Sequence, residues 1–389
     1  MNSIKVEDIK IGDTISGDSF VLDNLFFLPK NTSLTDTYKN ILMKWNIENI
    51  KIDDMASLSK NSSQPENINN KNELDQNNNK NENEIDQNNV KNVENKKDIV
   101  RDPEVEFLDK YKNWIYITMS FFTSIIKSRA IEKDKVASFI IEVKNCMEKE
   151  KKRFLKVIGH ELTGIPYVYR KTLETMTLAT LVSKNMNHNV YSSNNVMFAT
   201  LFHDIGMVTV PMSIINKTEP LTEEEATILK NHTVQGFKYL QAVGYSPLIA
   251  SGALQHHERL DGKGYPNQLK IDKITELAKI IAVVDTYCAS ISQKPFKPIP
   301  IHAKAAIQEL LKGSGTQYDQ EIVAHFIKNI SFYPIGSMVI LSDERIASVS
   351  DTSGIPMRPI VIINETNEEL DLSKNQSIFI KGVYVKKTN

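Results

Sequence analysis

Apolar residues recur with a helical period over most of the chain between Asp102 and about residue 329. One stripe begins at Phe107, Tyr111 and Trp114, and another begins at Val136. Apolar residues three and four positions apart lie on one face of a helix, and their simplest role is to form the buried faces of packed helices. The pattern therefore predicts a mainly helical region.

The two ends of the chain carry short strand-like patterns instead. Residues 1–55 alternate short apolar runs with turn signals around one helical pattern over Leu34–Trp45, so we expect a small α+β module there. After Tyr333-Pro334, several short runs rich in Val and Ile predict a short β tail over 331–389.

The segment between the first module and the helical region, residues 56–100, is low in complexity. Within 61–100 there are 14 Asn residues, and Lys, Glu, Gln and Asp make up most of the remainder. Such a composition cannot bury enough apolar surface to offset the entropy lost on ordering, so we expect a flexible linker. The predicted organisation is a module over 1–55, a linker over 56–100, a helical preamble over 101–160, a central domain over 161–330 and the tail over 331–389.

Composition and charge exclude several classes of protein. The hydrophobic share is 41% and the net charge is −1, which argues against a protein that binds nucleic-acid polymers or membranes through bulk positive charge. The two cysteines, Cys146 and Cys288, form no paired pattern, which excludes a disulfide-stapled secreted fold. The first ten residues lack the apolar core of a signal peptide, and the apolar run Trp114–Ile126 is too short for a membrane span. We therefore expect a cytoplasmic protein.

Helix start signals place two helices in the central domain. Thr222 followed by Glu225 has the spacing of a capping box, and the helix that it starts is expected to run to about Val243. Ser246-Pro247 marks the start of the next helix.

Four segments of the central domain carry histidine and aspartate at helix-length intervals. Their residues are His203, Asp204, His232, His256, His257 and Asp285. Each segment has an ordinary structural explanation when it is taken singly. The first is explained by a hydrogen-bonded His-Asp pair, the next two by satisfied histidines, and the last by an aspartate paired with Arg or Lys. Asp285 is the most telling residue, because an unpaired carboxylate in so apolar a helix carries a large desolvation cost.

Taken together, these side chains predict a metal site inside a helical bundle. Four imidazoles and two carboxylates form a nitrogen and oxygen donor set that suits Fe, Mn or Zn, including a pair of ions bridged by a carboxylate. Two ions about 3.5–4 Å apart can activate a water and stabilise the charge of an in-line phosphoryl displacement.

The same residues resemble the HD-GYP phosphodiesterase family over roughly residues 165–345. The resemblance rests on His203-Asp204-Ile205-Gly206 and on the loop His256-His257-Glu258-Arg259-Leu260-Asp261-Gly262-Lys263-Gly264-Tyr265-Pro266, which matches the signature that names the family. It implies an HD-type helical bundle and a bacterial, cytoplasmic enzyme of second-messenger signalling. That enzyme would hydrolyse cyclic di-GMP to pGpG, or onward to GMP, with a metal-activated water.

The resemblance also implies a role for each candidate residue. His203 and Asp204 would be catalytic, and two divalent ions, Fe or Mn, would be bridged by Asp204 and held by His203, Asp204, His232, His256, His257 and Asp285. Contacts to cyclic di-GMP would come from Lys217, Arg259, Tyr265, Lys294 and Lys297. The basic residues among these contacts also have an ordinary explanation as solvated surface charges. Protein partners in second-messenger signalling are a further implication of the resemblance.

Three positions depart from the family pattern. Met207 stands where the family has a lysine, Lys171 where it has a metal-ligand histidine, and Cys288 where it has a second carboxylate. A protonated amine cannot ligate a metal, so one metal position loses a ligand. Lys171 is also a candidate to supply the positive charge that is missing at Met207. Two alternatives stay open: a degenerate domain that binds cyclic di-GMP or a protein without turnover, and a hydrolase of another phosphate substrate.

Overall fold

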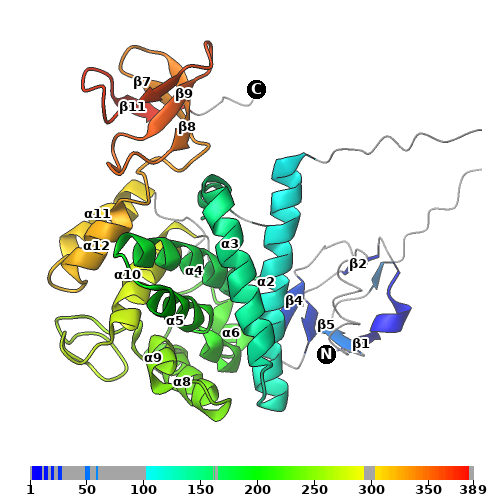
Figure 1. The fold of residues 1–389 in the computed structure, drawn as a ribbon. Coiled ribbons are helices and arrows are strands. Elements are labelled where there is room, and N and C mark those ends of the chain that lie inside the picture. Colours follow the sequence, from blue (N-terminus) through cyan, green and yellow to red (C-terminus); the bar gives the residue numbers. More distant parts are fainter. Residues whose placement is uncertain are drawn as a thin grey trace, which may run out of the picture.

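A computed structural model describes most of the chain beyond residue 101. The described residues are 2–10, 13–15, 19–21, 25–28, 49–52, 58–59, 102–160, 162, 165–292 and 303–384. Helices dominate these residues, and a small antiparallel sheet follows them toward the C-terminus (Figure 1). The prediction of a mainly α protein with a β tail is confirmed.

The helices follow one another with short connections. They are α2 (Pro103–Ser128), α3 (Lys133–Val157), α4 (Tyr167–Asn185), α5 (Val190–Leu201), the 3-10 helix η2 (Ile205–Thr209), α6 (Met212–Ile215), α7 (Glu223–Lys230), α8 (His232–Ala242), α9 (Pro247–Gln255), α10 (Glu276–Ile291), α11 (Ala303–Gly313) and α12 (Gln320–Ile327). None of the helices in the described part of the chain is long and apolar enough to cross a membrane.

Side-chain caps begin the helices that frame the site. Thr222 and Glu225 form the expected capping box at α7, and Ser246 accepts from the backbone of Ile249 at α9. One expectation is wrong in detail. The helix after Thr222 does not run unbroken to Val243, because a turn at Asn231 separates α7 from α8. His232 is therefore the first residue of α8 rather than a mid-helix residue.

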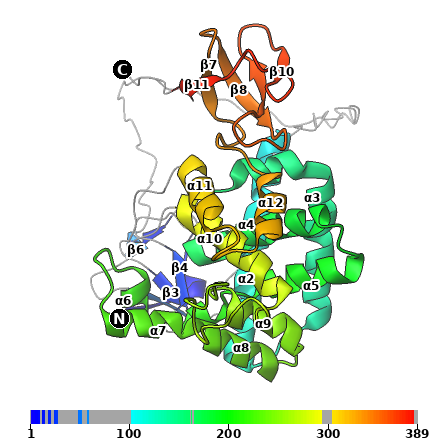
Figure 2. The ribbon, with the colours of Figure 1, turned by 90° about the vertical axis from the view of Figure 1, so that its left-hand side faces the viewer.

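Helix α4 lies at the centre of the bundle. It packs against α5, α10, α2 and α12, and α9 packs against α5, α10 and α8 (Figure 2). All but the ends of α4 are buried, including polar residues such as Lys171 and Glu174. The bundle interior therefore contains charge as well as apolar side chains, and this charge lies where α4, α5 and α10 meet.

The C-terminal sheet is antiparallel with the strand order β10-β9-β8-β7-β11. Its strands are β7 (Met338–Leu341), β8 (Ile346–Asp351), β9 (Ile360–Ile363), β10 (Glu369–Asp371) and β11 (Ile380–Val383). Buried and part-buried residues alternate along β7, β8 and β9, as expected for strands that cover a core with one face.

Short strands are also described in the first 60 residues. A four-stranded antiparallel sheet has the order β1 (Asn2–Lys5), β5 (Asn49–Ile52), β3 (Ser19–Val21) and β4 (Leu25–Leu28), and β2 (Thr14–Ile15) pairs with β6 (Leu58–Ser59). The predicted helix over Leu34–Trp45 and nearly all of the predicted linker lie outside the described residues. The domain boundaries proposed from the sequence stay predictions.

Candidate metal centre

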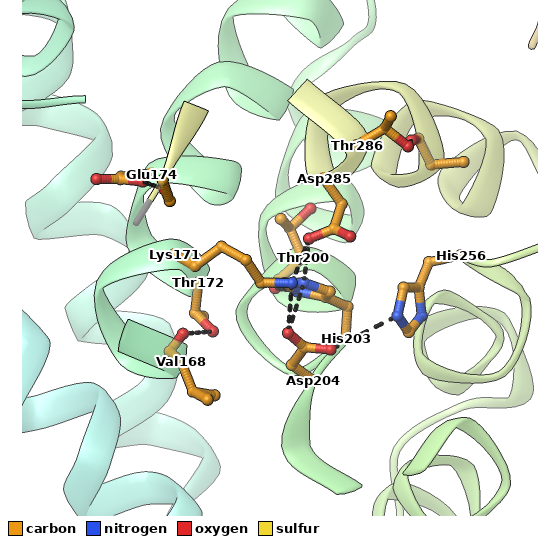
Figure 3. Close-up of polar contacts among 12 residues, drawn as sticks. Val168, Lys171, Thr172, Glu174, Thr200, His203, Asp204, His256, Asp285 and Thr286 are labelled. Atoms are coloured by element: carbon orange, nitrogen blue, oxygen red, sulfur yellow. Dashed lines mark hydrogen bonds and ion pairs between the residues drawn. The ribbon is translucent and has the colours of Figure 1, made fainter. Parts of the chain in front are cut away.

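Four segments of the helical region bring the predicted residues to one place. His203 and Asp204 lie in the turn after α5, and His232 begins α8. His256 and His257 follow α9, while Asp285 comes from the middle of α10. All are buried except His257, which is half-buried (Figure 3 shows most of them).

The donor atoms form two groups that share Asp204. One consists of Asp204, His232, His256 and His257, and the other of His203, Asp204 and Asp285; within each group the donor atoms all lie within 4.8 Å of one another. Asp204 presents a different oxygen to each side. Its Oδ1 lies 3.4 Å from His232 Nε2, and its Oδ2 lies 3.4 Å from His203 Nε2. The six predicted side chains therefore converge, with Asp204 between the two groups.

Backbone carbonyls fix the orientation of three imidazoles. Nδ1 of His203 lies 2.7 Å from the Thr200 carbonyl, Nδ1 of His232 lies 2.7 Å from that of Leu229, and Nδ1 of His256 lies 3.0 Å from those of Gly252 and Ala253. A carbonyl only accepts, so each Nδ1 carries the donated proton. Neutral His232 and His256 then present their Nε2 lone pairs to the site, as is usual for metal-ligating histidines. His203 differs, because Asp204 and Asp285 outweigh burial and raise its pKa.

Two of these lone pairs face each other. His232 Nε2 lies 3.3 Å from His256 Nε2, and both approach Asp204 Oδ1. Burial lowers the pKa of His232 to about 4, and it also lowers the pKa of His256. Both rings are therefore neutral at pH 7, and two acceptor nitrogens beside a carboxylate oxygen suit a cation between them.

The four-donor group fits one divalent metal ion. Three neutral imidazoles and one carboxylate are the donors that Fe, Mn or Zn prefer, and the Nδ1 bonds supply the outer support that such ligands need. Burial also lowers the pKa of His257 well below its ordinary value, so the fourth donor is neutral as well. We call Asp204, His232, His256 and His257 the four-donor group from here on.

The second group already holds a cation from the chain. Lys171 Nζ lies 2.6 Å from Asp285 Oδ1 and 2.7 Å from Asp204 Oδ2 (Figure 3). Burial alone would lower the pKa of Lys171, but the two carboxylates outweigh it and hold the pKa well above its ordinary value. Burial alone would likewise raise the pKa of each aspartate, and Lys171 and His203 reverse this, so both stay ionised.

Comparisons with known proteins identify this part of the chain. Residues 142–322 match the model of the HD domain family. A cyclic di-GMP phosphodiesterase from Pseudomonas aeruginosa is 28% identical over 237 residues, which are 61% of this chain and 56% of that protein. One from Thermotoga maritima is 37% identical over 164 residues, 41% of this chain and 44% of that protein. Residues 142–322 match an HD domain, and these relatives support its assignment to the HD-GYP family.

A solved structure supports the fold of this HD-GYP domain. An HDG"Y"P protein from Bdellovibrio bacteriovorus superposes with a TM-score of 0.50 and 13% identity, covering 84% of this chain and 97% of that chain. The chain spans about half the length of the curated relatives that it matches. The solved structure shows the fold, and the relatives support the family.

The signature loop of the HD-GYP domain is organised by Glu258, a residue to which the sequence assigned no role of its own. Glu258 is 2% exposed, and its two carboxylate oxygens accept from the backbone of Asn267 at 2.7 Å and of Leu269 at 2.9 Å. Tyr265 stacks on His257 with ring centroids 4.6 Å apart. The loop is thus tied back to the segment that carries His256 and His257. The available sequence signal was the place of this carboxylate directly after the candidate ligands His256 and His257.

Glu258→Gln is expected to loosen this loop. The glutamine amide would turn its NH₂ toward one of the two backbone N–H donors, leaving a buried donor unpaired and costing about 1–3 kcal/mol. The variant should unfold at a lower temperature, and the rate of hydrogen exchange should rise at the backbone amides of Asn267 and Leu269. Glu309→Gln, an exposed change on α11, is the matched control and should alter neither. Unchanged exchange at both amides in the Glu258 variant would contradict the assigned role.

The residues predicted to contact the substrate have different surroundings. Lys217 is paired with Glu225 at 2.6 Å, and Arg259 donates to the carbonyls of its own turn and to Thr286 Oγ1 at 3.2 Å. Both basic groups therefore have partners within the protein. Tyr265 flanks the four-donor group through its stacking on His257. Lys294 and Lys297 lie outside the described residues.

The other departures from the family pattern differ in their setting. Met207 lies half-buried in η2, three residues after Asp204. Cys288 is fully buried in α10, where burial raises the pKa of its thiol well above the ordinary value. An uncharged buried thiol is typical of a structural residue.

Proposed function

We propose that the protein is a metal-dependent phosphodiesterase that hydrolyses cyclic di-GMP. The observation that carries this proposal is the four-donor group, in which three neutral imidazoles and Asp204 converge beside an intact signature loop. The P. aeruginosa and T. maritima relatives are cyclic di-GMP phosphodiesterases, which supports this substrate. The product is proposed to be pGpG, with GMP as a further product.

The four-donor group would hold a divalent ion, for which Fe or Mn is proposed from the nitrogen-rich donor set. Such an ion supplies Lewis acidity and a water that ionises near neutral pH. Of the two ions expected from the sequence, the one in the four-donor group is better supported. That group offers four donors and no competing cation, whereas Lys171 contacts the carboxylates of the other group.

The chain's own residues determine the charge that an incoming phosphodiester meets. Asp204 and Asp285 alone would repel an anion, but Lys171 lies against both of them. With three neutral histidines and a divalent ion, the centre is net positive and attracts a phosphate group. His203 is proposed to act with Asp204 in catalysis, because its Nε2 lies 3.2 Å from Asp285 and 3.4 Å from Asp204.

Tyr265 is proposed to hold the substrate beside the ion. Its ring stacks on His257, and Lys230 Nζ lies 5.4 Å from the ring centroid. A guanine base could stack on such a ring, and a phosphate could accept from the Lys230 ammonium. These contacts would orient cyclic di-GMP without taking part in the chemistry.

Metal removal and return test this function. The full-length protein, prepared anaerobically, is stripped with a chelator and supplied with Mn²⁺, Fe²⁺ or Mg²⁺, and cyclic di-GMP is followed by chromatography. We expect turnover to vanish on stripping and to return with Mn²⁺ or Fe²⁺. Mg²⁺ should restore little, because it prefers oxygen ligands. Intact cyclic di-GMP with every metal would contradict the proposal.

A second candidate function is binding of cyclic di-GMP without hydrolysis. The placement of Lys171 against both carboxylates favours it, because this amine takes up oxygens that could otherwise serve a second ion. Tight binding measured by calorimetry, with the ligand recovered intact, would select this candidate. For this second candidate we also propose protein partners in signalling, which would be sought with the protein bound to cyclic di-GMP.

A further inference from the structure

The second donor group and the Lys171 amine compete for the same atoms. The oxygens of this group that face His203 Nε2 are Asp285 Oδ1, at 3.2 Å, and Asp204 Oδ2, at 3.4 Å. Lys171 Nζ contacts these same two oxygens at 2.6 and 2.7 Å. These are the lengths of charge-assisted hydrogen bonds, so the ammonium occupies the space between the carboxylates.

A metal ion cannot share that space. An ion held by these oxygens would lie about 2.0–2.2 Å from each of them. It would then lie within a few ångströms of the ammonium, in an interior where charges are poorly screened. The second group also offers only three donor residues, one of which, Asp204, is shared with the four-donor group.

Moving the Lys171 ammonium out of this space would cost a large free energy. The residue is 6% exposed and lies on α4, the central helix of the bundle, which packs against α5 and α10. Moving its charge away from Asp204 and Asp285 would leave two buried carboxylates uncompensated, and such a loss typically costs about 3–5 kcal/mol. The four-donor group does not meet this obstacle, because it uses the other oxygen of Asp204.

We propose that Lys171 permanently takes the place of a second metal ion, so that this chain binds one ion, in the four-donor group, beside a built-in ammonium. The inference rests on the proposed metal centre and deepens it. Lys171 is here a positioning residue, which neutralises Asp285 and holds Asp204 so that its Oδ1 faces His232 and His256. The second ion that the sequence predicted is thereby replaced by a side chain.

Counting ions tests the proposal without relying on activity. The stripped full-length protein is loaded with Mn²⁺ and desalted, its bound manganese is measured by elemental analysis, and its electron paramagnetic resonance spectrum is recorded. We expect one ion per chain and an uncoupled Mn²⁺ spectrum. Lys171→His should bind two ions with an exchange-coupled spectrum, because a neutral imidazole would add a fourth donor beside His203, Asp204 and Asp285. Lys238→His, an exposed change on α8, is the matched control and should keep one ion.

Removing two ligands of the four-donor group keeps the test decisive if Lys171→His does not fold. The double variant His232→Ala with His257→Ala leaves two donors in that group and should retain no ion while Lys171 is present. Two ions in the unaltered protein, or an ion retained by this double variant, would overturn the proposal. Two ions with turnover would overturn this inference and leave the proposed function standing. One ion without hydrolysis would do the reverse, and no ion at all would overturn both.

Discussion

Asp204→Asn is expected to reduce cyclic di-GMP turnover by roughly three orders of magnitude or more. Asp204 is the single residue shared by both donor groups, with Oδ1 facing His232 and His256 and Oδ2 accepting from Lys171. An amide cannot serve both sides, because its NH₂ would face either the imidazole lone pairs or the ammonium. The variant should also lose its metal, which elemental analysis measures on the same preparation.

Asp272→Asn is the matched control for this effect. Asp272 is an exposed aspartate whose ion pair with Lys273 is 3.8 Å long, so the same chemical change there should leave turnover and metal content within about twofold. Comparable turnover in the Asp204 and Asp272 variants would remove Asp204 from the catalytic centre and, with it, the proposed mechanism.

Gly206→Ala is expected to destabilise the protein by about 3 kcal/mol, because overpacking against backbone cannot be relieved by side-chain rotation. A Cβ at this position would lie 1.9 Å from the His232 carbonyl oxygen and 2.7 Å from the Gly236 nitrogen. Helix α8 would have to move away from η2, taking His232 away from Asp204. The midpoint temperature of thermal unfolding should fall by about 6–12 °C for a domain of this size, and the affinity for metal should fall as well.

Gly382→Ala supplies the comparison for the Gly206 variant. This glycine lies in β11, and a Cβ added there meets nothing within 4 Å. Its substitution should leave the unfolding temperature within about 2 °C, since surface changes usually alter stability by less than about 0.5 kcal/mol. Equal stability of the two variants would show that α8 can withdraw from η2 without cost.

Local signals identified much of the helical region in advance. The apolar stripes of α2 and α3 and the capping box at Thr222 are decided by residues close in sequence, so they can be read before any fold is known. The break at Asn231 was missed, because the helical pattern continues through it and only the packing of His232 against the site reveals it. The predicted helix over Leu34–Trp45 stays a prediction.

The sequence by itself determined which side chains are available for chemistry, since histidine and aspartate are rarely placed in apolar helices without a partner. Its resemblance to the HD-GYP family also predicted that Lys171 stands where a ligand histidine is expected, and a protonated amine cannot bind a metal. Only the tertiary structure decided where that amine lies. Lys171 is 114 positions from Asp285 along the chain, and the packing of α4 against α10 brings them to 2.6 Å. Contacts between distant segments depend on the whole bundle, so no local pattern could foretell that the lysine would occupy the second group.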